Sequence, residues 1–564
     1  MSRVIFPVLF SFLMSVPVQA QVSFSNPLLI PPALSGSFAE IRSNHFHSGI
    51  DLRTNEAEGL PVLAAADGFI SRIKVSATGF GKAVYLKHSS GVTTVYAHLH
   101  HFNDTLEKLV ETEQYLKKSF EVELFPAERS LPVNQGQLIG FSGNTGSSAG
   151  PHLHFEIRDT KTEMPFNPLS KLYPMEDTIA PVIRNIMLID YAPFNEAFYP
   201  ITRTVIPFND PEVTPVAPTD TLSFTSLAGI AVEADDRMNG SNAMLGVQKL
   251  ILKVDGKIAF SFEVERFSFG ETRYVNASID YSQLIEQGKT FILLHHLPGN
   301  DFSALSSQKN SGILDGEPSR ILQCEVSVID FHGNSVSQIF HIRKASQKTL
   351  PLFPESNRYI AFNKSPMARN DQARIEFPSG RVTYNIHDFD FLTVDSSIAE
   401  FSSFVMAGSS SIPLHQSCEL SIKTGNLPVS LQPKSVIVKL NDKNERISMG
   451  GVFQDGWVKS SIRTFGNFFV TIDTIAPVIN PLGITNDLIW QRSIISFKLS
   501  DDLSGIDKYE MTVDGKWVPA NFDLKTGHLF FVVPAGQTST ERNIKVKVTD
   551  RKGNRSVFEG RFSF

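Results

Sequence analysis

The sequence predicts an all-β, multidomain protein, on three observations. The chain has 564 residues with 41% hydrophobic content, which is too long for one compact core. A seven-residue motif, Asp177-Thr-Ile-Ala-Pro-Val-Ile183, recurs letter for letter at Asp473–Ile479. Short runs of alternating apolar and polar residues, typical of strands, occur before, within and between the two copies.

Each copy of the motif opens a segment with the same later motifs in the same order: a pair of aspartates, a Val-Asp-Gly turn, and an aspartate before Gly-Asn. The Val-Asp-Gly turns, at Val254 and Val513, predict β-hairpins because glycine tolerates the positive φ of tight turns. Both segments resemble immunoglobulin-like or fibronectin-like modules, which implies β-sandwiches over 176–344 and 473–564. Strand patterns such as Ser435–Leu440 predict a third β module over 345–472.

The aspartates of the two repeated segments are expected to accept hydrogen bonds from turn backbones. A calcium site built from Asp235 and Asp236, or from Asp501 and Asp502, is the less favoured alternative, since paired carboxylates suit an oxygen-seeking cation. The two cysteines, Cys324 and Cys418, are expected to be buried free thiols, although an exported protein permits a disulfide.

The first 20 residues predict a cleaved signal peptide. Arg3 precedes the apolar run Val4–Met14, and Val18-Gln-Ala20 places small residues at a cleavage point. No later apolar run has the length of a transmembrane helix. We therefore expect export to the periplasm or cell surface without a transmembrane anchor after cleavage. The net charge of −6, without clustered basic residues, argues against nucleic acid as a partner.

The chemistry is expected in residues 21–175, where histidines gather. Eight of the fifteen histidines lie between residues 45 and 154, and the pattern His-x-His occurs there three times. Clustered imidazoles favour a metal site over scattered structural roles.

Strand periodicity predicts which of these side chains meet. In the strand that begins at His152, alternation puts His152, His154 and Glu156 on one face. The strand Val92–His98 similarly puts Tyr96 and His98 on one face. His47 and Asp51 add an imidazole and a carboxylate, and Gly49 between them is expected to let the backbone bend so that both converge.

Such a group of side chains suits catalytic zinc. Two imidazoles and one carboxylate leave the fourth tetrahedral position open for water. Zinc lowers the pKa of that water to about 7, which makes hydrolysis possible at neutral pH.

Three motifs carry a resemblance to the LytM and lysostaphin type of zinc peptidoglycan endopeptidases. They are His47-x-x-x-Asp51, Tyr96-x-His98-Leu99 and Gly150-Pro-His152-Leu-His154-Phe-Glu156. The resemblance implies an antiparallel β-sheet groove domain with one Zn²⁺ held by His47, Asp51 and His154. It also implies that His98 and His152 are the catalytic pair, one activating the water and the other stabilising the oxyanion. The implied substrates are the peptide stems or cross-bridges of peptidoglycan.

The other histidines and Glu156 have several interpretations. His88, His100 and His101 are expected to be surface or supporting groups. His45 shares strand parity with His47, so contact with substrate or support of a ligand is an alternative. Glu156 either orients a ligand or forms a salt bridge.

Two further segments shape the expected domain. The insertion 102–131 predicts a helix that is capped at Asp104 and Glu107. Its apolar face is predicted to consist of four residues, Leu106, Leu109, Val110 and Leu116. This helix is either a lid over the groove or a packing element. The run Gly140–Gly150 lacks the Gly-Lys-Ser/Thr ending of a phosphate-binding loop, so we predict a turn that forms one wall of the groove.

Three functions stay open from the sequence. The first is a zinc-dependent endopeptidase that cuts peptidoglycan cross-links in wall remodelling. The second is a non-catalytic zinc-binding activator of other wall hydrolases, against which the presence of all five site residues argues. The third is a peptidase that acts on protein substrates. The β modules could bind envelope polymer or envelope proteins, or only extend the catalytic domain.

Overall fold

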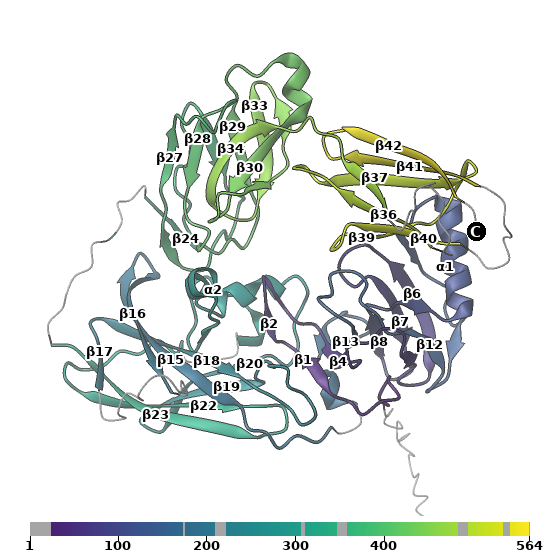
Figure 1. Ribbon diagram of the computed structural model, residues 1–564. Coiled ribbons are helices and arrows are strands. Elements are labelled where there is room, and N and C mark those ends of the chain that lie inside the picture. Colours follow the sequence, from purple (N-terminus) through teal and green to yellow (C-terminus); the bar gives the residue numbers. More distant parts are fainter. Residues whose placement is uncertain are drawn as a thin grey trace, which may run out of the picture.

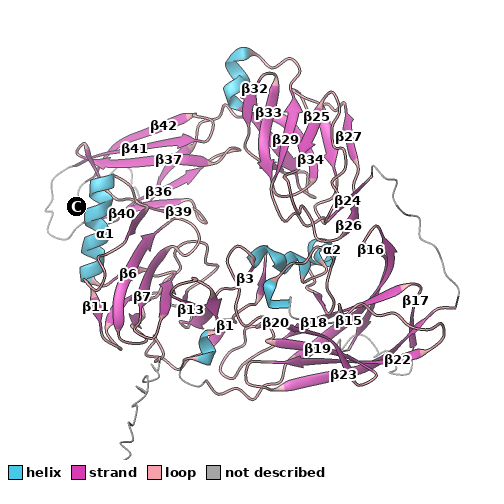
Figure 2. Cartoon of the chain, turned by 180° about the vertical axis from the view of Figure 1, so that it is seen from behind, coloured by secondary structure: helices cyan, strands magenta, loops and turns pink. Residues whose placement is uncertain are grey.

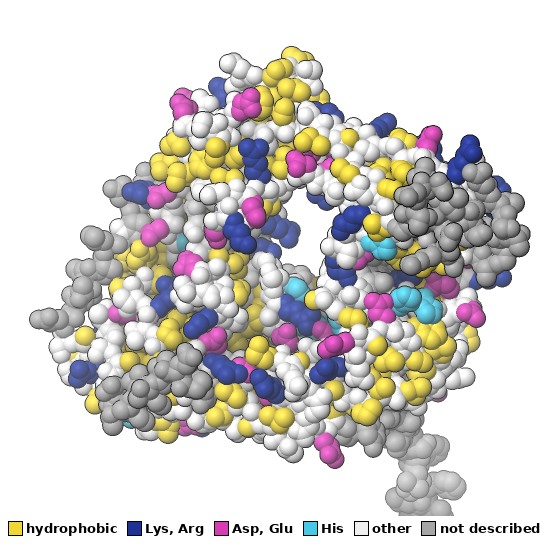
Figure 3. All heavy atoms as spheres, viewed as in Figure 1, with side chains coloured by type: hydrophobic (Ala, Val, Ile, Leu, Met, Phe, Trp, Pro, Cys, Tyr) yellow, Lys and Arg dark blue, Asp and Glu magenta, His cyan; other side chains and the backbone are white. Residues whose placement is uncertain are grey.

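The computed structural model describes residues 24–172, 175–208, 221–305, 311–346, 353, 358–482, 494–533 and 542–562. The predicted signal peptide, 1–20, lies outside the described residues. The protein is nearly all-β and multidomain, as expected, with 8% of its residues in helices and 48% in strands. Its parts follow one another around a ring (Figure 1), and the space-filling view shows an opening through the middle, with lysine and arginine side chains at its rim (Figure 3).

The N-terminal domain, residues 24–172, is built on a nine-stranded antiparallel sheet. Its order is β1-β4-β13-β8-β7-β6-β10, with β11 beside β6 and β14 beside β13. The strands are β1 (Leu34–Gly36), β4 (Ile50–Arg53), β6 (Gly68–Val75), β7 (Lys82–Lys87), β8 (Val92–Ala97), β10 (Val122–Leu124), β11 (Pro132–Val133), β13 (His152–Asp159) and β14 (Pro165–Phe166). Smaller elements are β2 (Ile41–Arg42), β3 (His45–Phe46), β5 (Pro61–Leu63), β9 (His101–Phe102), β12 (Leu138–Phe141) and η1 (Pro168–Ser170).

The predicted helical insertion contains α1 (Asp104–Lys117), with a different cap and face from those expected. Asn103, not Asp104, caps the helix, because its side chain accepts from the backbone of Leu106. The face turned to the core carries Leu106, Val110 and Gln114. The predictions for Leu109 and Leu116 were wrong, since these side chains are 38% and 77% exposed. The helix packs against β9 and β10, as the packing interpretation requires.

The first β module, residues 176–344, contains two sheets whose buried side chains share one apolar core, as in a β-sandwich. The first sheet has β16 (Ala197–Pro207), β15 (Val182–Phe194), β18 (Leu227–Asp235) and β21 (Ile292–Leu293). The second has β17 (Thr221–Phe224), β23 (Ser335–Lys344), β22 (Ile321–Ile329), β19 (Lys249–Val254) and β20 (Lys257–Glu263). Short helices are η2 (Thr272–Ala277), α2 (Tyr281–Gln287) and η3 (Ser303–Leu305).

The second β module, residues 358–472, also has two main sheets. One has β25 (Ala373–Glu376), β29 (Cys418–Lys423), β33 (Trp457–Ile462) and β32 (Val452–Gln454). The other has β27 (Phe391–Val394), β28 (Phe404–Ala407), β34 (Gly466–Ile472), β30 (Ser435–Leu440) and β31 (Arg446–Ser448). A separate pair is β24 (Tyr359–Ala361) with β26 (Ile386–Asp388), and η4 spans Val429–Lys434. The strand predicted at Ser435–Leu440 is confirmed.

The third β module, residues 473–562, repeats the two-sheet plan. One sheet has β35 (Val478–Leu482), β36 (Ile494–Ser500), β40 (His528–Val532) and β39 (Asn521–Asp523). The other has β38 (Lys516–Trp517), β37 (Ile506–Val513), β41 (Arg542–Asp550) and β42 (Arg555–Phe562). Both predicted hairpins form with Asp-Gly turns in the left-handed region, φ 48° and 77° at Asp255-Gly256 and 49° and 74° at Asp514-Gly515.

The cysteines are both buried and free, as expected, and they lie in different β modules. Burial raises the pKa of each thiol to about 12.

Within the described ranges, no helix is long and apolar enough to cross a bilayer. Strands therefore form almost the whole framework, and α1 stands out as the longest helix in Figure 2.

Candidate metal centre

Strand register assembles the candidate metal centre. Strand β13 lies between β4 and β8, and His154 of β13 is directly opposite Asp51 of β4 and Ala97 of β8. Directly opposed residues share a face of a sheet. Alternation then adds His152 and Glu156 to the same face as His154, as the sequence predicts.

His98 reaches this face by a different route from the expected one. Tyr96 and His98 were predicted to share a face, but Tyr96 points into the core, packed edge-on to Phe155, and its hydroxyl accepts from the backbone of Ala65. Strand β8 ends at Ala97, and His98 has a left-handed backbone with φ 59°. This turn breaks the alternation and directs the His98 ring toward His152, at 4.9 Å between ring centroids.

Gly49 has a tighter role than the predicted bend. A Cβ atom at Gly49 would lie 2.3 Å from the carbonyl oxygen of Phe155, so only glycine lets this stretch pack directly against β13. Its φ lies outside the left-handed region. Close approach brings His47, at the end of β3, beside His154, with 4.9 Å between ring centroids.

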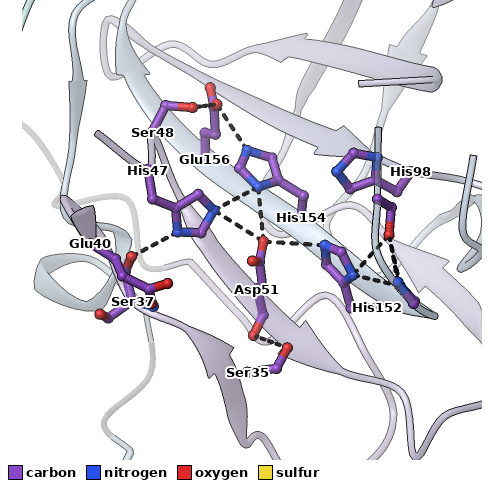
Figure 4. A network of polar contacts seen from close by, with 12 residues as sticks. Ser35, Ser37, Glu40, His47, Ser48, Asp51, His98, His152, His154 and Glu156 are labelled. Atoms are coloured by element: carbon purple, nitrogen blue, oxygen red, sulfur yellow. Dashed lines mark hydrogen bonds and ion pairs between the residues drawn. The ribbon is translucent and has the colours of Figure 1, made fainter. Parts of the chain in front are cut away.

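Three atoms converge at the centre of Figure 4. The Nε2 atom of His47 lies 3.1 Å from Oδ1 of Asp51 and 3.0 Å from Nδ1 of His154, and the last two atoms are 2.9 Å apart. The Nε2 atom of His152 lies 3.3 Å from the same Oδ1. The three residues are 2–4% exposed, so the atoms meet inside the protein.

The outer nitrogen of each imidazole is held by an acceptor. His47 donates from Nδ1 to the carbonyl oxygen of Ser37 (2.7 Å), and His154 donates from Nε2 to Glu156 (2.9 Å). Nδ1 of His98 donates to the carbonyl oxygen of Thr145 (2.8 Å), and Nδ1 of His152 to that of Gly150 (2.8 Å). These four bonds hold the outer nitrogens as donors, so the inner nitrogens are the ones that face the centre.

Charged neighbours anchor the two carboxylates. The second oxygen of Asp51 accepts from Arg42 at 2.6 Å. Glu156 is fully buried, accepts from Ser48 (2.5 Å) and is paired with Arg158. Neither carboxylate is left with an unpaired charge in the interior.

Burial and neighbouring charges shift the pKa values of this group. Burial opposes ionisation of Asp51, but His47, His152 and His154 outweigh it and hold its pKa well below the usual range. Burial likewise lowers the pKa of His154, yet its bonds to Asp51 and Glu156 raise that pKa to about 9. Burial lowers the pKa of His98 to about 3, which keeps His98 neutral.

The donor set fits a divalent cation. Nitrogen and oxygen lone pairs converging at about 3 Å repel one another unless a proton or a cation lies between them. Ligand atoms about 2.0–2.1 Å from a tetrahedral ion lie about 3.4 Å apart, so His47, Asp51 and His154 need to move by only a few tenths of an ångström. Acceptors behind both imidazoles complete the arrangement that metal-binding histidines use.

The remaining histidines stay outside the centre. His45 is exposed and bonds the carbonyl oxygen of Ser43, so it does not share the site with His47. His88 is buried and bonds Asp67 and Thr94. His100 and His101 contact each other, with 2.8 Å between their Nδ1 atoms. These three have supporting or surface positions, as predicted.

The glycine-rich run before β13 borders the centre, as predicted. It supplies the carbonyls that hold His98 and His152, and Gly146 packs so closely on Gly79 that a Cβ atom would lie 2.3 Å from the Gly79 oxygen. Lys525 of the third β module donates to the carbonyl oxygens of Asn144 (2.5 Å) and Ser148 (3.0 Å) of this run.

Some contributors gave no sequence signal. Arg42 lies outside the three motifs, five residues before His47, and no pattern in the sequence links it to Asp51. Ser37 and Thr145 act through backbone carbonyls, which any residue carries. Phe80, which stacks on His154 at 5.1 Å between ring centroids, looks like an ordinary apolar residue in the sequence.

Comparisons with known proteins agree with this geometry. The model of peptidase family M23 matches residues 45–122 and 122–168, and that of a Zu5-like domain matches 357–473. The DD-carboxypeptidase/endopeptidase Mpg of Neisseria meningitidis is 38% identical over 128 residues, 23% of each chain. The peptidoglycan DD-endopeptidase ShyC of Vibrio cholerae is 34% identical over 99 residues, 18% of this chain and 17% of ShyC.

A solved structure, the catalytic domain of lysostaphin from Staphylococcus simulans, is 25% identical, with a TM-score of 0.18 over 24% of this chain and 86% of that one. The aligned segment spans less than a quarter of the length of Mpg and of ShyC. Family M23 consists of metallopeptidases. This chain therefore carries an N-terminal peptidase M23 domain and, further along, a Zu5-like domain.

Proposed function

We propose that this chain is a zinc-dependent endopeptidase that hydrolyses peptide cross-links of bacterial peptidoglycan in wall remodelling, at the periplasm or the cell surface. The observation that carries the proposal is the convergence of His47, Asp51 and His154, with the inner nitrogens of His98 and His152 beside them. The names of Mpg and ShyC support peptidoglycan as the substrate class.

In this proposal His47, Asp51 and His154 hold the zinc ion. Bound there, zinc supplies a Lewis acid that makes water nucleophilic near neutral pH. His98 and His152 are the catalytic pair. Each is held by a backbone carbonyl through Nδ1, so its Nε2 faces the reacting groups. One imidazole, in its neutral form, accepts the proton of the attacking water and returns it to the leaving amine, while its partner, protonated at Nε2, donates to the developing oxyanion.

Arg42 and Glu156 are positioning residues. Arg42 holds the outer oxygen of Asp51, so the inner oxygen stays directed at the ion. Glu156 keeps the proton of His154 on Nε2, which leaves Nδ1 free to bind. A buried, prearranged set of this kind avoids reorganisation during the reaction.

The test is digestion of purified peptidoglycan by residues 21–564, with the fragments identified by mass spectrometry. We expect new peptide termini within the stems or cross-bridges, their loss after chelation, and their return with stoichiometric zinc. The same chain with His98→Ala is the inactive control. Absence of zinc-dependent fragments overturns the proposal, and stimulation of another wall hydrolase without cleavage identifies an activator instead. Cleavage restricted to protein substrates identifies a general peptidase.

A further inference from the structure

The two repeated β modules place three carboxylates at the same positions. Asp177 and Asp473 open the seven-residue motif, and Asp330 and Asp550 precede Gly-Asn by the same interval. In both modules an asparagine, Asn334 or Asn554, donates to the later aspartate and to the backbone carbonyl of the first.

Strand register identifies the third member of each trio. Val182 pairs with Asp235, and its equivalent Val478 pairs with Ser500. Asp235 is therefore equivalent to Ser500. The next residues, Asp236 after β18 and Asp501 after β36, are equivalent to each other. The pairs Asp235-Asp236 and Asp501-Asp502 look alike in sequence, but the structure aligns the second aspartate of the first pair with the first aspartate of the second pair.

Two carboxylates of the first trio, those of Asp177 and Asp236, border a small cavity. Ligand atoms of Asp177, Asp330 and His332 all lie within 4.8 Å of one another. Asp177, Asp236 and His332 line the cavity, whose volume is about 30 Å³, enough for a single ion or water. Asp236 is only 6% exposed, and its Oδ1 atom is buried without a hydrogen-bond partner.

Among the described residues, the only ion-pair partner of this trio is the imidazole of His332, whose Nδ1 lies 3.8 Å from Asp177. The side chains of Asp177, Asp236 and Asp330 are all buried. In the part of the chain that the structure describes, none of the three forms an ion pair with lysine or arginine. Burial, together with Asp330 and Asp177, raises the pKa of Asp236 to about 7. Buried carboxylates normally have a cationic partner or a metal.

The third β module provides an internal comparison. Lys552 occupies the position of His332, and both Asp473 and Asp550 raise its pKa against the lowering effect of burial. The ammonium group of Lys552 bonds the carbonyl oxygen of Gly451 and attracts that trio without an ion pair among the described residues. In the first β module the same position carries an imidazole, His332, in place of that ammonium group.

We propose that Asp177, Asp236 and Asp330 bind one Ca²⁺ ion in the first β module. Three carboxylates and neighbouring backbone carbonyls are the oxygen ligands that this cation prefers. Turn hydrogen bonds to Asp177 and Asp330 are compatible with this role, because each carboxylate has about four lone pairs.

The site lies at a junction that matters for the peptidase centre. The cavity is also lined by Leu34, Ser37 and Phe38 of the N-terminal domain. Ser37 bonds Gly246 of the first β module through its hydroxyl and His47 through its carbonyl. Calcium at this junction fixes the first β module against the segment that holds His47.

The experiment uses the full chain, stripped of metal, reloaded with one equivalent of zinc and titrated with CaCl₂ alone. We expect one bound Ca²⁺ by calorimetry and a rise in Tm of about 5 °C at saturation. The variant Asp236→Asn should lose both the heat of calcium binding and the rise in Tm. Asp501→Asn, at the equivalent position, and the exposed Asp502→Asn should keep both.

Folding of the variant is checked without calcium. Asparagine at position 236 removes repulsion among the three carboxylates, so the Tm of Asp236→Asn in EGTA should equal or exceed that of the unmodified chain. Absence of calcium heat in the unmodified chain, retention of the calcium shift in Asp236→Asn, or tighter binding of Mn²⁺ or Zn²⁺ than of Ca²⁺ at this site each overturns the proposal. These readouts are independent of peptidase activity.

Discussion

The ammonium group of Lys525 lies 3.0 Å from the carbonyl oxygen of Ser148, a residue 377 positions earlier in the chain. It also bonds both the carbonyl and the side chain of Asn144. The third β module thereby contacts the glycine-rich run whose carbonyls hold His98 and His152. A residue at one end of the chain thus supports the proposed catalytic pair at the other.

Lys525→Ala should lower kcat by about threefold to tenfold while zinc content stays at one per chain. Loss of the ammonium frees the run that positions His98 and His152, and small misplacements of catalytic groups are costly. Steady-state hydrolysis of soluble wall fragments measures the effect. Lys508→Ala, an exposed lysine of the same module, is the matched control. Unchanged kcat in Lys525→Ala would show that the contact does not reach the catalytic pair.

The two histidines of the His-x-His motif should separate metal binding from catalysis. His154→Ala removes one of the three convergent ligand atoms, so bound zinc should be lost along with activity. His152→Ala leaves that triangle intact, so the protein should retain most of its zinc and still be inactive. Zinc content by atomic emission and fragment release measure the two effects. Equal zinc loss in both variants would contradict the division of roles.

Glu156→Gln should lower zinc affinity about 10–100-fold, the usual cost of losing an outer partner of a metal-binding histidine. Glutamine keeps the size of the side chain but no longer carries the charge that fixes the proton on His154 Nε2. Competition with a chromogenic chelator measures the affinity. Glu163→Gln changes the other, half-exposed partner of Arg158 and should leave affinity unchanged.

The first β module should lose stability as pH falls from 6.5 toward 4 because of His295. Burial lowers its pKa to about 4, so the unfolded state binds a proton in this range and the folded state does not. The contribution of His295 to the free energy of unfolding is fully present above pH 6.5. At pH 5 the free energy of unfolding is lower by about 2 kcal/mol.

His295→Gln should therefore narrow the difference in Tm between pH 7.5 and pH 5, by about 5 °C if this module unfolds as a unit. The comparison by differential scanning calorimetry needs His341→Gln, a partly exposed histidine of the same module, as its control. An identical pH difference in His295→Gln and the unmodified chain would exclude His295 as the source.

Sequence periodicity was sufficient where the backbone is regular. The His152 strand alternates from its first residue, so the common face of His152, His154 and Glu156 followed directly. Alternation failed at His98, because a single left-handed residue after β8 reverses the direction of the side chain. The predicted apolar face of the helix was wrong at Leu109 and Leu116. A surface helix contacts the core through only part of its apolar stripe, so some leucines of that stripe stay exposed. Carbonyl partners such as Ser37 depend on tertiary proximity, which no local pattern encodes.

The ring of Figure 1 is closed in part by the Lys525 bonds and by the edge-on pair of Tyr115 and Trp517, 5.7 Å between ring centroids. Contacts this small do not hold separate proteins together. Within one chain, however, the ends meet at an effective concentration that can reach the millimolar range, so a weak contact persists. A single cut between the β modules abolishes that advantage, and the third β module should then dissociate from the peptidase domain although no residue of the contact has changed.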